Sequence, residues 1–181
     1  MVYNEHMPFL QPSSSITYLE LLPGMRVADF GCGSGHWALL LAQAVGPSGK
    51  VFAIDVQETA LSATRSQAKN ARLENIETIR ADLEIPGASH LKDAAVDAVL
   101  ISNMLFQADE KANVAAEAAR IVKPNGRVFL IEWDEVEGGA GPSASQRIPR
   151  QTAEHMFESF GFRFEKEFVA GSHHYGLIFR K

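Results

Sequence analysis

The chain has 181 residues, of which 22 are acidic and 17 basic, giving a formal net charge of -5. This length suits one domain with its own core, and the acidic balance argues against a nucleic-acid backbone as the main partner. Its single cysteine, Cys32, excludes an intramolecular disulfide, and the sequence lacks the run of about 20 apolar residues that crosses a bilayer. Residues 1–11 also lack the basic and apolar regions of a signal peptide. We therefore expect a cytoplasmic protein without membrane insertion.

The first predicted element is a short helix over residues 12–22. Its apolar residues recur at helical spacing, its three serines at residues 13–15 offer N-cap oxygens, and Pro23-Gly24 ends the pattern. Strand-like apolar runs then alternate with helical runs. Strands are predicted over residues 27–30, 51–56, 76–80, 96–102 and 127–133. The helices between them are predicted over residues 36–45, 58–71 and 109–122, the last of them ended by the Lys-Pro-Asn-Gly sequence at residues 123–126.

The last third of the chain begins with a glycine-rich loop over residues 137–142 and a helix over residues 152–160. Strands over residues 162–169 and 175–180 follow, joined by a turn near Gly171. Because this connection is too short for a parallel crossover, the two strands should pair antiparallel. The sequence therefore predicts an α/β fold with three layers: a doubly wound, mostly parallel sheet of about seven strands, with an antiparallel C-terminal hairpin and helices on both faces.

The glycine-rich sequence Asp-Phe-Gly-Cys-Gly-Ser-Gly at residues 29–35 lies directly between a predicted strand and a predicted helix. Glycine there permits unusual backbone angles and a close approach of the main chain to a ligand. Asp55 ends the next predicted strand, where its carboxylate can accept hydrogen bonds from two ribose hydroxyls. Ligands of such sheets bind at the carboxyl ends of the strands. Asp55 favours this binding interpretation over a purely structural turn.

The sequence resembles the class I (Rossmann-like) S-adenosylmethionine-dependent methyltransferases, in the branch that includes the ubiquinone and menaquinone C-methyltransferases. The resemblance covers residues 25–133 strongly. It is carried by the glycine sequence, Asp55, Ala81-Asp82, residues 96–99 and residues 123–126. Where many relatives of this branch have a histidine after the fourth strand, this chain has Phe106-Gln107. This departure leaves the methyl acceptor open.

The resemblance implies that S-adenosylmethionine (AdoMet) is the cofactor and S-adenosylhomocysteine (AdoHcy) its product. Asp29 would orient the glycine loop and hold the methionine amino group, and Asp55 would bind the ribose diol. Asp82 would meet the adenine amino group, with Leu83 against the ring. The complete set of expected cofactor contacts is Asp29, Gly31, Cys32, Gly33, Gly35, Asp55, Val56, Ala81, Asp82, Leu83, Ser102 and Asn103.

The same resemblance divides a single domain into three parts. Residues 1–22 would form an N-terminal arm and helix, residues 25–133 the cofactor-binding core, and residues 134–181 the substrate-side loop, helix and hairpin. No metal is expected, because none of the six histidines forms a helical i, i+4 pair. Cys32 is expected to be a small filler of the glycine loop.

Two other functions are compatible with parts of the sequence. A nicotinamide dehydrogenase would carry G-x-G-x-x-G, but here the third glycine comes one residue early, and Asp29 would face a pyrophosphate unfavourably. A methyltransferase-like binding subunit without a substrate site is the second alternative. The sequence leaves the oligomeric state open.

The methyl acceptor is expected to be a small molecule, and the sequence shows no unmistakable general base. Asn103, Gln107 and Trp133 are candidates near the transferred methyl group, as are Glu132 and Asp134. Each of them is better explained as a positioning or packing residue.

A cover over the cofactor is also expected, because methyl transfer benefits from a dry site. The aromatic-rich N-terminal arm, with Tyr3, His6, Phe9 and Tyr18, is one candidate, and the glycine-rich loop at residues 138–142 is the other. The alternative is that the arm is frayed.

Overall fold

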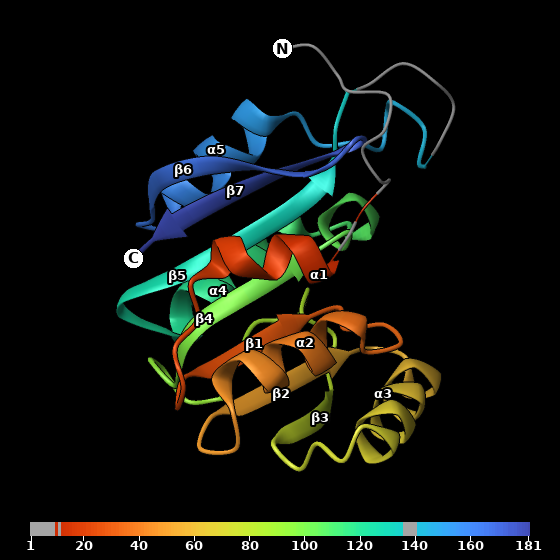
Figure 1. The fold of residues 1–181 in the computed structure, drawn as a ribbon. Coiled ribbons are helices and arrows are strands. Elements are labelled where there is room, and N and C mark those ends of the chain that lie inside the picture. Colours follow the sequence, from red (N-terminus) through yellow and green to blue (C-terminus); the bar gives the residue numbers. More distant parts are fainter. Residues whose placement is uncertain (1–9, 11, 136–140) are drawn as a thin grey trace.

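A seven-stranded sheet runs through the computed structural model, which describes Leu10 and residues 12–135 and 141–181 (Figure 1). The strand order is β3-β2-β1-β4-β5-β7-β6. The strands are β1 (Arg26–Phe30), β2 (Lys50–Asp55), β3 (Ile76–Arg80), β4 (Val96–Ser102), β5 (Val122–Trp133), β6 (Arg163–Gly171) and β7 (His174–Arg180). β1 to β5 pair in parallel, and β7 is antiparallel to both β5 and β6. The predicted fold class is confirmed.

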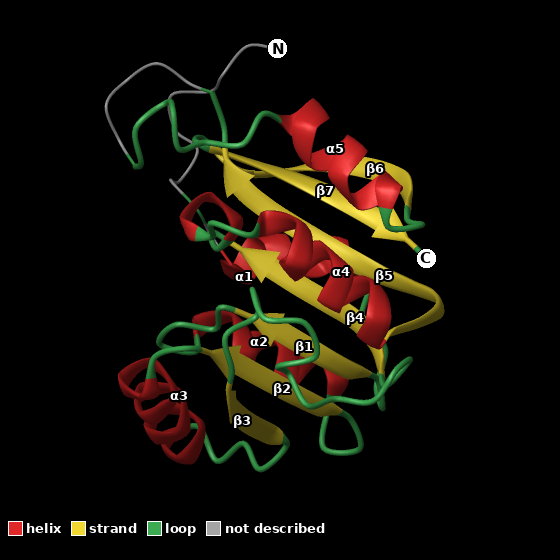
Figure 2. Ribbon diagram, turned by 180° about the vertical axis from the view of Figure 1, so that it is seen from behind, coloured by secondary structure: helices red, strands yellow, loops and turns green. Residues whose placement is uncertain are grey.

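Helices cover both faces of the sheet, as the two opposite views show (Figures 1 and 2). One face carries α1 (Pro12–Ser15), α2 (His36–Val45) and α3 (Glu58–Asn70). The other face carries α4 (Lys111–Ile121) and α5 (Arg150–Ser159). Two short 3-10 helices, η1 (Ile16–Leu19) and η2 (Leu105–Gln107), complete the set. No helix in the described residues combines the length and apolar character that a membrane crossing requires.

The central strands are buried because successive side chains enter opposite cores. In β4, Val99 and Ile101 pack in the core under α4 and α5, while Leu100 packs in the core under α2 and α3. All three side chains are fully buried. A strand that is covered on both faces has apolar residues at nearly every position, as the sequence of β4 has. This near-continuous apolar run is the pattern that predicted the strand.

The N-terminal helix is shorter than predicted. Instead of one helix over residues 12–22, α1 is followed by the 3-10 helix η1, which ends at Leu19. Glu20 then adopts a left-handed conformation with φ 47°, and its carboxylate forms ion pairs with Arg127 at 3.2 Å and Lys166 at 2.8 Å. These partners come from distant strands, so helical periodicity alone does not reveal the early end. The serines expected to cap the helix lie within α1.

The helix before residues 123–126 ends within one residue of the prediction, but the fifth strand begins earlier than predicted. β5 begins at Val122, directly after α4, because Val122 already pairs with Val96 of β4. A register shift between Val96 and Ala98 accommodates residues 123–126 within the strand. Asn125 takes the left-handed conformation there, with φ 63°, which asparagine tolerates better than most residues.

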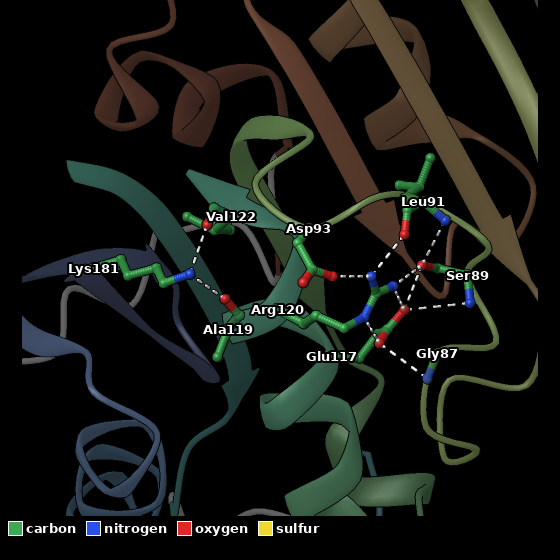
Figure 3. Close-up of polar contacts among 9 residues, drawn as sticks. All are labelled: Gly87, Ser89, Leu91, Asp93, Glu117, Ala119, Arg120, Val122 and Lys181. Carbon is green, nitrogen blue, oxygen red and sulfur yellow. Dashed lines mark hydrogen bonds and ion pairs between the residues drawn. The ribbon is translucent and has the colours of Figure 1, made fainter. Parts of the chain in front are cut away.

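The long loop between β3 and β4 is fastened to α4 by an ion pair whose carboxylate is buried (Figure 3). Glu117 is only 2% exposed, and its carboxylate accepts the backbone N–H groups of Gly87 at 3.2 Å and Ser89 at 3.3 Å. Arg120 pairs with Glu117 at 2.7 Å and donates to the carbonyl of Leu91, also at 2.7 Å. Although burial opposes ionisation of Glu117, the hydrogen bonds from Arg120 and Ser89 lower its pKa below the usual value. The loop that follows β3 therefore has a fixed position.

Candidate cofactor cleft

A cleft of about 770 Å³ opens at the carboxyl ends of β1, β2, β3 and β4. Its walls include the segments at the ends of these strands, namely residues 31–34, 55–57, 81–84 and 102–104. The strand order reverses at β1, whose neighbours are β2 on one side and β4 on the other. Doubly wound sheets bind their ligands at such a reversal, because the loops on its two sides diverge and leave a crevice.

The glycines of residues 31–35 serve different purposes. Gly33 lines the cleft in a left-handed conformation with φ 52°, and a Cβ atom added there would meet no atom within 4 Å. Its backbone is therefore open to an incoming ligand. Gly35, with φ 90°, does not line the cleft, and its added Cβ would lie 2.8 Å from the Thr64 hydroxyl oxygen of α3. Gly35 thus allows the loop to pack against α3.

Asp55 is held rigidly at the wall of the cleft. One of its carboxylate oxygens accepts the backbone N–H of Gly33 and the other that of Gln57, each at 2.9 Å. A carboxylate offers about four lone-pair sites, so both oxygens keep capacity for further donors. The arrangement is suited to a pair of neighbouring hydroxyl groups.

Asp29 lies beneath the glycine loop and does not line the cleft. It is 1% exposed. Burial, together with the charge of Asp55, raises its pKa to about 7, although a backbone hydrogen bond from Ala38 acts to lower that pKa. Its Oδ2 atom has no hydrogen-bond partner among the described residues. This half-satisfied carboxylate makes the site favourable for a cationic ligand group nearby.

The wall after β4 combines Ser102, Asn103 and Met104. The indole N–H of Trp37 donates to the Ser102 hydroxyl at 3.0 Å. Asn103 has a left-handed φ of 53° and donates its backbone N–H to the Ile131 carbonyl at 2.9 Å. Its side-chain oxygen Oδ1 is buried, with no partner in the described part of the chain.

The opposite wall, at the ends of β2 and β3, combines apolar side chains with carboxylates. Ala81 and Leu83 are buried, whereas Val56 is 53% exposed. Asp82 is exposed, and its carboxylate accepts the backbone N–H of Glu84 at 3.0 Å. All the predicted cofactor residues except Asp29 and Gly35 thus line one cleft.

Cys32 lines the cleft but is 7% exposed. Burial, followed by the nearby charge of Asp29, raises the pKa of its thiol to about 12. The thiol therefore stays protonated at neutral pH, as a filler of the loop would. In the described residues, no three His, Cys, Asp or Glu side chains gather as a metal site would need.

The catalytic candidates occupy different environments. Gln107 lines the cleft, where its amide donates to the Asn103 carbonyl at 3.0 Å. Trp133 does not line it and packs against the His174 ring at 4.4 Å between centroids. Asp134 is engaged in an ion pair with Arg150, and Glu132 is fully buried. Of these four, only Gln107 has direct access to the cleft.

Several lining residues were not predicted: Leu10, Pro12, Ser34, His36, Trp37, Gln57, Ala60, Glu84, Met104 and Ala108. Most of them directly neighbour a predicted position, so extending each motif by a residue or two would have included them. Leu10 and Pro12 come from the N-terminal arm, whose aromatic Tyr18 instead stacks on Phe168 of β6 at 5.1 Å. Tyr3, His6 and Phe9, together with residues 138–140 of the glycine-rich loop, lie outside the described residues.

Comparison with known proteins agrees with this geometry. Residues 27–126 match the family described as "Methyltransferase domain". The demethylmenaquinone methyltransferase of Bacillus cytotoxicus is 32% identical over 118 residues, which are 65% of this chain and 48% of the relative. That of Bacillus cereus is 31% identical over the same shares. The chain thus spans about half the length of the curated relatives it matches.

Solved structures resemble the whole sheet. A SAM-dependent methyltransferase from Aquifex aeolicus superposes with a TM-score of 0.85 at 26% identity, covering 95% of this chain and 90% of that one. A putative type 11 methyltransferase from Sulfolobus solfataricus gives 0.75 at 26% identity, with 96% and 93% covered. Fold and cleft together define a class I, Rossmann-like domain. The chain belongs to the methyltransferase domain family.

Proposed function

We propose that this protein transfers a methyl group from AdoMet to a small-molecule acceptor. The observation that carries the proposal is the Asp55 carboxylate, fixed by two backbone amides at the wall of a cleft that also contains the open face of Gly33. The similarity to demethylmenaquinone methyltransferases supports a small acceptor. The single cysteine and the acidic net charge support a cytoplasmic protein that does not act on nucleic acid.

The residues fit AdoMet chemically. The cofactor combines a ribose diol, an adenine ring, an ammonium group and a sulfonium cation. Asp55 retains acceptor capacity for the diol, and the exposed carboxylate of Asp82 beside buried Leu83 suits the adenine amino group and ring. Asp29 Oδ2 and Asn103 Oδ1, which have no hydrogen-bond partner among the described residues, offer negative potential toward cationic groups.

The charge of the cleft favours the same ligand. Its described lining contains Asp55, Asp82 and Glu84 but no lysine or arginine. A dinucleotide would bring a pyrophosphate to these carboxylates, which would repel it. A positively charged ligand is attracted by them. This asymmetry favours AdoMet over a nicotinamide cofactor.

AdoMet supplies an electrophilic methyl group when bound. The protein's part is to orient the acceptor, and such alignment can contribute on the order of 7–11 kcal/mol to lowering a barrier. Ser102 and Asn103 fix one wall, and the Gln107 amide is held by the Asn103 carbonyl beside it.

Two experiments test the proposal. Calorimetry with AdoMet, AdoHcy and NAD should show binding of the first two only, and tight NAD binding without an AdoMet signal would contradict it. A screen of small-molecule acceptors with methyl-labelled AdoMet should then yield a methylated product. AdoMet binding without turnover on any acceptor would favour the binding-subunit alternative.

A further inference from the structure

Glu132, near the carboxyl end of β5, is a buried carboxylate that contacts the wall of the cleft from behind. It is 0% exposed. Its Oε1 atom accepts the backbone N–H of Met104 at 2.9 Å and that of Leu105 at 2.7 Å. Its other oxygen, Oε2, has no hydrogen-bond partner among the described residues. Burying a carboxylate is unfavourable, so this position is informative about what the carboxylate holds in place.

The turn that Glu132 contacts contains a left-handed residue. Asn103 has φ 53°, a conformation that asparagine tolerates better than most residues and that the hydrogen bonds around this turn hold in place. Ile131 accepts the Asn103 backbone N–H, and Glu132 accepts the next two. Consecutive residues of β5 therefore fix three consecutive amides of this turn.

The turn shapes the cleft directly. Asn103 and Met104 both line it, and the Met104 side chain covers Gly31, where an added Cβ would lie 2.8 Å from Met104 Cγ. A displacement of the turn would therefore move both the wall after β4 and the side chain that packs on the glycine loop. Glu132 itself does not line the cleft, and its contact with the cleft wall is made through this turn.

We propose that Glu132 is a positioning residue: its Oε1 atom, as the shared acceptor of the Met104 and Leu105 amides, holds Asn103 and Met104 where they form the cofactor wall. The inference rests on the proposed function. The position of the acceptor oxygen matters, and the negative charge does not. Two conservative variants separate these properties, because glutamine keeps the oxygen in place without the charge, whereas aspartate keeps the charge and withdraws the oxygen by one methylene group.

The test measures AdoHcy affinity by calorimetry and amide hydrogen exchange of Met104 and Leu105 by NMR without ligand. Glu132→Gln should bind within threefold of the wild type and retain both protected amides. Glu132→Asp should bind at least tenfold more weakly and lose the protection. Phe157→Leu is the control for stability, because Phe157 is fully buried in α5 against Phe179 and lies away from the cleft. It should lower Tm with affinity unchanged.

Three outcomes overturn the inference. These are wild-type affinity and protection in Glu132→Asp, weak binding in a folded Glu132→Gln, and an equal loss of affinity in Phe157→Leu at matched Tm. If the wild type fails to bind AdoHcy, the proposed function is wrong. The exchange rates of the two amides still decide whether Glu132 holds the turn.

Discussion

The carboxylate of Asp55 and the backbone amide of Gly33 are joined by a 2.9 Å hydrogen bond that ties the end of β2 to the glycine loop after β1. Two loops that diverge from neighbouring strands are thereby held in one arrangement before any ligand arrives. Pre-organisation of this kind reduces the ordering that binding would otherwise require.

Replacing Asp55 with alanine should weaken AdoHcy binding at least about tenfold. The change removes a charged acceptor, and hydrogen bonds to charged groups contribute roughly 1.5–3 kcal/mol, while 1.4 kcal/mol corresponds to one decade in affinity. Asp82→Ala should have a smaller effect, because that carboxylate is exposed. Calorimetry on both variants measures the difference, and equal, negligible losses would show that the cofactor binds elsewhere.

Two glycine substitutions should fail in different ways. In Gly35→Ala the new methyl group would lie 2.8 Å from the Thr64 hydroxyl and 3.1 Å from its Cα, so Tm should fall. Gly33→Ala has open space for its methyl group, so the protein should fold with a modest left-handed strain and lose AdoHcy affinity. Thermal unfolding and calorimetry distinguish the two effects. A Gly33→Ala protein with unchanged affinity would place the ligand away from this loop.

Folding stability should decrease between about pH 4 and pH 7. Burial raises the pKa of Asp29 from 3.8, and that of Glu132 from 4.5, to about 7 in each case. Over this range the unfolded chain has already released the two protons that the folded state keeps, and stability falls wherever the unfolded state binds fewer protons. Below the range both states are protonated, and above it both are ionised, so the curve should flatten.

Urea denaturation at a series of pH values measures this dependence. Asp29→Asn should show a shallower decrease than the wild type, and Asp29→Asn with Glu132→Gln a shallower one still. Slopes that do not change in either variant would assign the pH dependence to other groups.

Arg120→Ala should destabilise the protein by about 3 kcal/mol, because removing one partner leaves a buried carboxylate without its counter-charge. The side chain of Glu117 is 1% exposed. Asp93→Ala removes a second carboxylate that pairs with Arg120. The Asp93 side chain is 82% exposed, so this change should cost less than about 1 kcal/mol. Chemical denaturation of both variants provides the comparison. Equal losses would mean that Glu117 is better solvated than its burial indicates.

The sequence was sufficient for the features that depend on local pattern. The apolar run of β4 and the alternation of strands and helices predicted the doubly wound sheet, because each is a direct consequence of burial on two faces. The glycine spacing and Asp55 likewise marked the cleft, since the chain passes through it at the ends of successive strands.

Features that depend on contacts between distant residues could not be predicted. The left-handed Glu20 pairs with Arg127 and Lys166, and no local signal announces that pairing. The environment of Glu132 is similar: it was a candidate near the methyl group, but only the folded structure shows that it holds the amides of Met104 and Leu105. Asp29 was expected to orient the glycine loop and hold the methionine amino group, and the folded structure adds that its side chain is almost fully buried.

The placement of β7 affects how the molecule is made. β7 follows β6 in the chain but lies between β5 and β6 in the sheet. During synthesis on a ribosome, β6 therefore emerges before β7, the strand that connects it to β5 and the other strands of the sheet. Until His174–Arg180 has left the exit tunnel, β5 presents an unpaired edge, which is a template for association with other chains.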